Sequence, residues 1–357
     1  MTLLRVCGLA LALFAIAGSA TALAQGTSNN AKAQQERRDT QPLNNAPVWR
    51  EVRSGNEGFT SLPGREMGIL IQPPLRYPGQ SAFVTAGEAW RNFRNGPVTV
   101  YGGWVLIVVA LAIAAFFATR GALKLHEKPV GRLLARFNSI ERVTHWTVAI
   151  SFVVLAVSGL IMLFGKHVLL PVIGYTLFGW LTALAKNLHN FIGPLFILGL
   201  LLMIVLYVKD NFPKAVDLQW FAKAGGLFSG AHVPSGRFNA GEKGWFWAGV
   251  VVLGIVVSVS GLILLFPNFE QLRATMQSAW IVHAAAGLIF MAISLGHIYL
   301  GTIGVEGAYQ AMRSGNVDET WAKEHHELWY NEVKKGGAKS APGGAVPAGA
   351  PHMREKQ

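Results

Sequence analysis

The chain alternates between long apolar runs and polar segments rich in basic residues. Five runs reach the length that a helix needs to cross a bilayer, at about 99–119, 143–164, 187–208, 244–266 and 279–303. Because a backbone in lipid must satisfy its own hydrogen bonds, each run is predicted to be a helix. The pattern predicts an all-α membrane protein: a four-helix transmembrane bundle over 143–303, preceded by one extra N-terminal transmembrane helix.

The N-terminal region has the features of an exported protein. A basic start at Arg5, an apolar core and the pattern Ala22-Leu23-Ala24 are typical of a secretory signal peptide over 1–24. An uncleaved membrane anchor is the alternative, because the apolar stretch is nearly long enough to span. Residues 25–98 are polar and contain many Gly and Pro residues, so we expect a periplasmic segment that needs a partner to become ordered.

Basic residues are distributed unequally among the loops. They concentrate at 120–142, at 209–243 and in the tail after 303, whereas the other two loops contain few. Since cytoplasmic loops carry an excess of Lys and Arg, we predict a multi-pass protein of the bacterial inner membrane with a cytoplasmic C-terminus. The tail, 304–357, is expected to be disordered from about 336.

Composition narrows the class of function. The chain is 52% hydrophobic and only 14% charged, which excludes an ordinary soluble globule. The net charge of +12 does not indicate nucleic acid, because the basic residues lie beside the apolar runs as topology signals. Cys7 is the only cysteine, so the bundle has no thiolate for an iron–sulfur cluster or a thioether-linked haem. No catalytic residue is predicted.

Histidine supplies the candidate chemistry. Four of the ten histidines lie in or at the edge of the predicted spans: His145, His189, His283 and His297. His283 and His297 are roughly 21 Å apart along one helix and point in nearly the same direction. Residues at a similar depth in the membrane can face each other. This predicts a pair of His189 and His283 on the periplasmic side, and a pair of His145 and His297 on the cytoplasmic side.

Two histidines that face each other across a bundle can fill both axial positions of a haem iron, which favours electron transfer. We therefore predict two b haems on these four ligands. Gly193 and Gly287 each follow a ligand by one helical turn and would clear space for a porphyrin, with close helix packing as the alternative. The separation excludes one shared zinc or copper site, whereas a transporter or proton channel with structural histidines remains an alternative.

Several short motifs resemble those of a known family. They are Arg142-Val-Thr-His145-Trp146, Leu188-His189, His283-Ala-Ala-Ala-Gly287, His297-Ile-Tyr299, Arg237-Phe-Asn-Ala-Gly-Glu-Lys243, Trp321-Ala-Lys-Glu-His-His326 and Trp329-Tyr330. Over about 136–335 the chain resembles the gamma subunit, a di-haem cytochrome b, of membrane-bound formate dehydrogenase. The four histidines alone are shared with the cytochrome b subunits of nickel–iron hydrogenases, which remain an alternative.

The resemblance implies one subunit of an oxidoreductase complex, with no formate chemistry in this chain. Electrons would come from an iron–sulfur beta subunit, supplied by a molybdenum- or tungsten-containing alpha subunit, and would reduce menaquinone or ubiquinone near the cytoplasmic-side haem. Asn239 and Gly241 would help to form the quinone pocket beside His297. A turn that begins the next helix is the alternative for these two residues.

We also make predictions for a few other polar residues on the cytoplasmic side. Glu242 is expected to be a solvated loop carboxylate, with proton uptake for the quinone as the alternative. His325 and His326 are expected on a solvated helix face or at the lipid surface rather than in a metal site. No role is assigned to the remaining histidines, His126, His167, His232 and His352.

Overall fold

The computed structural model describes residues 86–226, 233–269 and 271–335. The predictions for the signal peptide, for most of the segment at 25–98 and for the tail from about 336 lie outside these residues. The chain divides into two units, with the boundary after Asn95. The described part of the first unit contains helix α3 (Ala86–Phe93), and the π-helical turn η2 (Arg94–Val98) follows it.

The second unit is built from long helices. They are α4 (Thr99–Arg120), α5 (Ser139–Val168), α6 (Leu170–Tyr207), α9 (Gly254–Leu265) and α10 (Arg273–Tyr299). The short helix α8 (Ala240–Gly244) continues into α9 through the π-helical segment η5 (Trp245–Leu253), and α10 ends in η6 (Leu300–Gly304). Five helices of the described residues are long and apolar enough to cross a membrane, so the predicted all-α membrane fold is confirmed.

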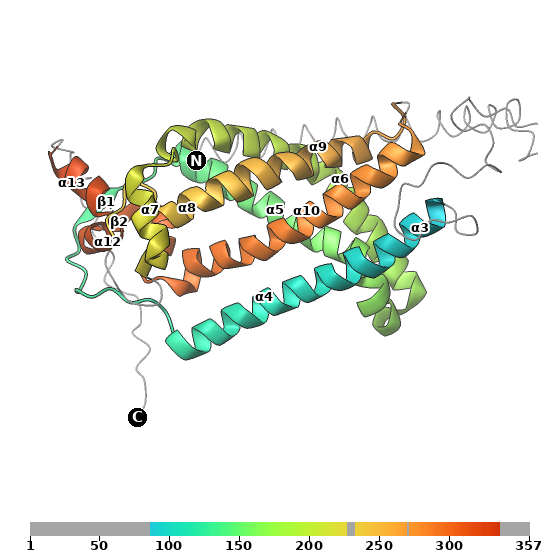
Figure 1. Ribbon diagram of the computed structural model, residues 1–357, viewed down its shortest axis with the longest axis horizontal. Coiled ribbons are helices and arrows are strands. Elements are labelled where there is room, and N and C mark those ends of the chain that lie inside the picture. The colour runs from blue at the N-terminus through green and yellow to red at the C-terminus, as the bar shows by residue number, and fades with distance from the viewer. Residues whose placement is uncertain (1–85, 227–232, 270, 336–357) are drawn as a thin grey trace, which may run out of the picture. The chain divides into compact units, whose positions relative to one another are not determined.

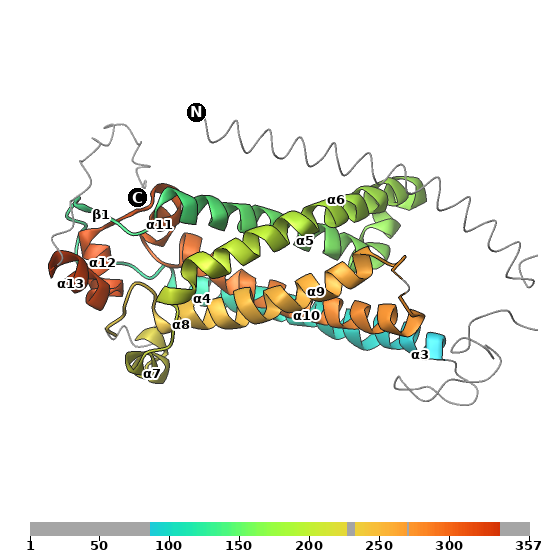
Figure 2. The ribbon, with the colours of Figure 1, turned by 90° about the horizontal axis from the view of Figure 1, so that it is seen from above.

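Two helix hairpins form the bundle, and α4 lies along one of them (Figures 1 and 2). In one hairpin α5 packs along α6, and in the other α9 packs along α10, which also contacts α4. Phe196, Leu200 and Phe290 are buried in the centre of the bundle. The outer surface remains apolar, since Leu111 and Val205 are largely exposed, as expected for side chains that contact lipid.

The connection between α5 and α6 is shorter than the apolar runs predict. The sequence suggests a loop between 164 and 187, but α5 extends to Val168 and α6 begins at Leu170. The helix is interrupted only at Gly174, whose φ of 74° and ψ of 171° are readily adopted by glycine alone. Apolar residues continue through this region, so hydropathy does not mark where the chain bends.

A polar cap covers one end of the bundle, at the left of Figure 1. We define it as the described parts of 121–138, 208–239 and 304–335. Its elements are η3 (Val208–Asp210), α7 (Ala215–Ala222), η4 (Ala224–Gly226), α11 (Ala308–Ser314), α12 (Glu319–His325), α13 (Glu327–Lys335) and the strands β1 (Leu133–Ala135) and β2 (Asn316–Asp318).

The cap joins three segments that are far apart in the sequence. The two short strands pair antiparallel, with Leu134 opposite Val317. Val317, Trp321 and Ala322 are buried within the cap. The predicted loops and the first part of the predicted tail therefore fold together as one layer over the bundle.

Candidate functional site

Two histidines face each other in the half of the bundle away from the cap. His189 lies on α6 and His283 on α10, and their ring centroids are 6.0 Å apart. The ring planes are nearly perpendicular, with an angle of 75° between them. These are the two residues that the predicted depths assign to the periplasmic side.

A second pair lies beside the cap. His145 is in the second turn of α5, and His297 is near the end of α10. Their ring centroids are 6.2 Å apart and their planes are inclined by 59°. The structure thus brings together the same two pairs that the predicted depths join.

The spacing within each pair fits one metal ion between two imidazole rings. An imidazole nitrogen binds a first-row metal at about 2 Å, and the ring centre lies about 1 Å beyond it, so two rings on opposite sides of an ion have centroids about 6 Å apart. Among the residues that the structure describes, no group of three or more His, Cys, Asp and Glu could hold a metal ion. Two axial histidines with a macrocycle between them are the arrangement of a b haem.

A serine on the neighbouring helix holds the Nδ1 atom of His189. Ser158 on α5 has its Oγ 2.8 Å from that nitrogen. The same hydroxyl donates to the carbonyl of Val154, 2.7 Å away, so its lone pair accepts a hydrogen bond from Nδ1–H. This contact assigns the tautomer of His189 and leaves Nε2 as the nitrogen that can bind a metal.

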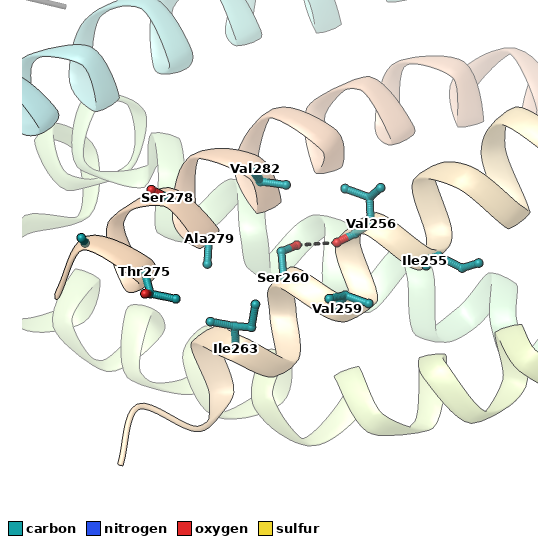
Figure 3. A pocket seen from close by; sticks show the side chains of 10 residues that line it. Ile255, Val256, Val259, Ser260, Ile263, Thr275, Ser278, Ala279 and Val282 are labelled. Carbon is teal, nitrogen blue, oxygen red and sulfur yellow. Dashed lines mark hydrogen bonds between the residues drawn. The ribbon is translucent and has the colours of Figure 1, made fainter. Parts of the chain in front are cut away.

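The other hairpin repeats this contact. Ser260 on α9 has its Oγ 3.1 Å from Nδ1 of His283 and donates to the carbonyl of Val256, 2.6 Å away. Figure 3 shows Ser260 and its bond to Val256 in the wall of an apolar groove between α9 and α10. The carbonyl of Val257, 3.0 Å from the same Nδ1, is a second acceptor. Nδ1 of His283 therefore also carries the hydrogen.

Sequence reasoning missed both serines, although a signal is present. The pentapeptide Val-Ser-Gly-Leu-Ile occurs twice, at 157–161 in α5 and at 259–263 in α9. The glycine of each copy lies beside a histidine: a Cβ at Gly159 would be 3.6 Å from Cε1 of His189, and one at Gly261 would be 3.1 Å from Cε1 of His283. The two hairpins thus repeat one local arrangement around the first pair.

The pair beside the cap has different surroundings. Nδ1 of His145 is buried and has no hydrogen-bond partner in the described part of the chain, in contrast to Nδ1 of His189 and of His283. Trp245 in η5 stacks on the ring of His297, with centroids 4.8 Å apart and planes within 11°. Short π-helical segments such as η5 often occur at functional sites.

Contacts with the cap fix the start of α5, which carries His145. The side chain of Asn138 accepts a hydrogen bond from the backbone N–H of Glu141, which closes a capping box at the helix N-terminus. Arg237 donates to both carboxylate oxygens of Glu141, at 2.8 and 2.9 Å. Burial opposes the charge of Arg237, but its bonds to Glu141 and Asp210 raise its pKa.

Gly193 and Gly287, which are predicted to leave space for a porphyrin, lie beside open space. A Cβ built at Gly193 or Gly287 meets no atom within 4 Å. Close helix packing does not explain a glycine at either position. The open space fits the predicted clearance for a porphyrin, which remains a prediction.

Asn239 begins α8, as in the alternative interpretation. Its side-chain oxygen accepts from the N–H of Glu242 at 2.9 Å, and the Glu242 carboxylate accepts from the N–H of Asn239 at 2.8 Å. Gly241 lies under Trp220, because a Cβ there would be 2.6 Å from that ring. Contact of Asn239 and Gly241 with a quinone remains a prediction.

Glu242 is not a freely solvated carboxylate, and the expectation from the sequence is wrong on this point. Arg136 donates to its two oxygens at 3.0 and 3.3 Å. The side chain of Arg136 is only 4% exposed, and that of Glu242 is 36% exposed. The guanidinium of Arg136 also lies over the rings of Phe137 and Trp321. Glu242 therefore neutralises a buried charge, a role that its place in a polar loop does not reveal.

His326 also differs from its expectation, because its side chain is 1% exposed and does not lie on a solvated helix face. Its Nδ1 bonds the carbonyl of Gly236 at 2.7 Å, and its Nε2 is 3.9 Å from Glu242. Burial, followed by the positive charge of Arg136, lowers the pKa of His326 to about 3. Its neighbour His325 has a buried Nε2 with no hydrogen-bond partner in the described part of the cap.

Comparison with known proteins identifies the family of this chain. The family described as prokaryotic cytochrome b561 matches residues 136–315. The cytochrome b556(Fdn) subunit of the nitrate-inducible formate dehydrogenase of Escherichia coli K12 is 32% identical over 219 residues, which cover 58% of this chain and 95% of that protein. The formate dehydrogenase cytochrome b556(fdo) subunit of the same organism is 32% identical over 217 residues, which cover 58% of this chain and 97% of that protein.

A more distant relative is the cytochrome b556 subunit of formate dehydrogenase from Haemophilus influenzae, which is 26% identical over 210 residues, or 56% of this chain and 83% of that protein. The five apolar helices and the family match define a multi-pass membrane cytochrome b. The chain belongs to the prokaryotic cytochrome b561 family, which implies that it binds haem b. The resemblance to formate dehydrogenase cytochrome b subunits that the motifs indicate is confirmed.

Proposed function

We propose that this chain is the membrane cytochrome b subunit of a formate dehydrogenase complex and carries electrons through two b haems to quinone. His189 and His283 would hold one haem, and His145 and His297 would hold the other. The observation that carries this proposal is the pair of centroid distances, 6.0 and 6.2 Å, at two depths along α10. When bound, each haem would supply a one-electron carrier.

The basic residues of the cap indicate the direction in which electrons cross the membrane. Its basic residues favour the cytoplasmic side, so the pair away from the cap lies on the periplasmic side. Electrons then enter at His189 and His283 from the iron–sulfur beta subunit, which receives them from the molybdenum- or tungsten-containing alpha subunit. They leave at His145 and His297 for menaquinone or ubiquinone. Both relatives are named as subunits of formate dehydrogenases, which favours formate over hydrogen as the source of the electrons.

Residues at the junction of the cap and the bundle form the quinone end of this path. Asn239 and Gly241 are the candidate pocket residues, and Trp245 keeps the ring of His297 in one plane. Quinone reduction consumes protons as well as electrons. Glu242 is partly exposed, so it is the candidate group for proton uptake from the cap side.

Purification of the tagged chain from membranes with its natural partners tests this function. We expect a molybdenum- or tungsten-containing subunit and an iron–sulfur subunit to co-purify, two b haems per chain, and reduction of the b-type absorption bands by formate. Added quinone should then reoxidise the bands.

Two results would overturn the proposal. Reduction of the bands by hydrogen but not by formate, with a nickel–iron partner, would assign the chain to a hydrogenase. A colourless protein that moves protons or a solute across liposomes would indicate a transporter with structural histidines.

A further inference from the structure

The two histidine pairs differ in the groups that contact their outer nitrogen atoms. His189 and His283 each bond a serine hydroxyl through Nδ1, at 2.8 and 3.1 Å. Both serines occupy the same place in the repeated Val-Ser-Gly-Leu-Ile segment. Nδ1 of His145 has no such partner among the described residues. This difference separates both histidines of the pair away from the cap from His145 beside it.

The direction of these hydrogen bonds determines their effect on a ligand. Each serine hydrogen is directed to a carbonyl of its own helix, that of Val154 for Ser158 and that of Val256 for Ser260. The serine oxygen therefore accepts from the histidine. An imidazole that donates from Nδ1 has a more basic Nε2, which stabilises the oxidised metal more than the reduced one. It is also held in one orientation about its side-chain bonds.

We propose that Ser158 and Ser260 are positioning residues of the periplasmic-side haem site, fixing the planes of the rings of His189 and His283 and holding the reduction potential of this site below that of the other. The inference rests on the proposed function, because it assumes that these histidines bind a haem iron. A lower potential at the site where electrons enter makes their transfer toward the cap favourable. The two serines thus contribute to the direction of electron flow.

Single and double substitutions to alanine test the inference in the complete complex. Ser158→Ala and Ser260→Ala each remove one hydrogen bond, and Thr at either position restores a hydroxyl. Ser151 and Ser258 are matched controls, because both are buried and donate to the carbonyl four residues earlier on the same two helices. Within the described residues, neither Ser151 nor Ser258 bonds a histidine.

Two readouts distinguish positioning from a general structural role. The midpoint potential of the periplasmic-side haem should become more positive in each alanine variant, more so in the double variant, and return toward the wild-type value with threonine. The low-temperature EPR signal of the oxidised haem should change as well, since its largest g value depends on the angle between the ligand planes, which is 75° here. Ser151→Ala and Ser258→Ala should change neither quantity.

The outcome that overturns the inference is an unchanged potential and EPR signal in Ser158→Ala and Ser260→Ala, equal to those of the two controls, in a protein with both haems. Failure of the proposed function is a different result. In that case the wild-type protein itself would lack a low-spin haem signal that depends on His189 and His283.

Discussion

His145 and His297 meet where the cap joins the bundle, with their ring centroids 6.2 Å apart. They lie at the first turns of one long helix and the last turn of another. The ring of His297 is also stacked on Trp245, whereas that of His145 has Trp146 at its edge, 5.4 Å away between centroids. The contacts of Asn138 and Arg237 that hold the start of α5 also help to position His145, which we propose as a haem ligand.

Replacement of His297 by alanine should remove one haem and leave the other. Since His297 belongs to the pair beside the cap, quinone reduction should be abolished while formate still reduces the remaining haem. Haem content and formate-reduced difference spectra measure both effects. His167→Ala, at the exposed end of α5, is the control and should retain both haems. Loss of only the periplasmic-side signal in His297→Ala would refute the assignment.

Substitution of Trp245 by leucine should weaken the site beside the cap. An aromatic contact of this kind contributes about 1 kcal/mol, so the variant should lose haem several-fold more readily on dilution in detergent. Trp245→Phe keeps a ring and should lie close to wild type. The exposed Trp180 provides a control through Trp180→Leu. Equal haem retention in Trp245→Leu and Trp180→Leu would show that the stacking has no effect.

Removal of the Glu242 carboxylate should destabilise the cap. In Glu242→Ala the buried guanidinium of Arg136 loses its charge partner, which we expect to cost about 2 kcal/mol because Glu242 itself is partly exposed. The thermal unfolding temperature in detergent should fall accordingly. Glu127→Ala is the control, since that carboxylate pairs with Lys323 at the surface and both side chains are exposed. A similar unfolding temperature in the two variants would contradict the role given to Glu242.

Acid should destabilise the cap through His326. Its pKa is about 3 in the folded protein and about 6.5 when unfolded, so the unfolded state binds more protons between these values. Stability is therefore present above pH 6.5 and is lost as the pH falls toward 3, by up to about 5 kcal/mol. His326→Asn, which keeps a side-chain amide, should lose less stability between pH 7.5 and 5 than wild type does. An equal acid-dependent loss in wild type and His326→Asn would count against this explanation, and His167→Asn is the control.

Hydropathy and helical geometry were sufficient to predict the bundle and the two histidine pairs. The apolar runs match the helices because lipid leaves few alternatives to a helix. The axial rise of a helix gives the depths of His283 and His297 in the membrane. Each then pairs with the histidine that lies at a similar depth on another helix. The sequence underestimates the helices most where apolar residues continue through the bend at Gly174, and it also misses the polar first turns of α5, from Ser139, and of α10, from Arg273.

Contacts between distant polar segments could not be predicted in this way. Glu242 and His326 look like surface residues in the sequence, but Glu242 pairs with the buried Arg136 from a distant segment, and His326 is buried in the cap after α12. Ser158 and Ser260 were missed for a related reason. Serine is common in membrane helices, and its contact with a histidine becomes visible only when two helices are placed side by side.

The most direct test of the central claim is EPR spectroscopy of the oxidised, purified protein, combined with a haem count for wild type and for four single histidine-to-alanine variants. We expect two low-spin signals in wild type. His189→Ala and His283→Ala should remove one of them, and His145→Ala and His297→Ala should remove the other. A single haem per chain, or loss of the same signal in His145→Ala and His283→Ala, would contradict the proposal that each of the two histidine pairs holds one haem.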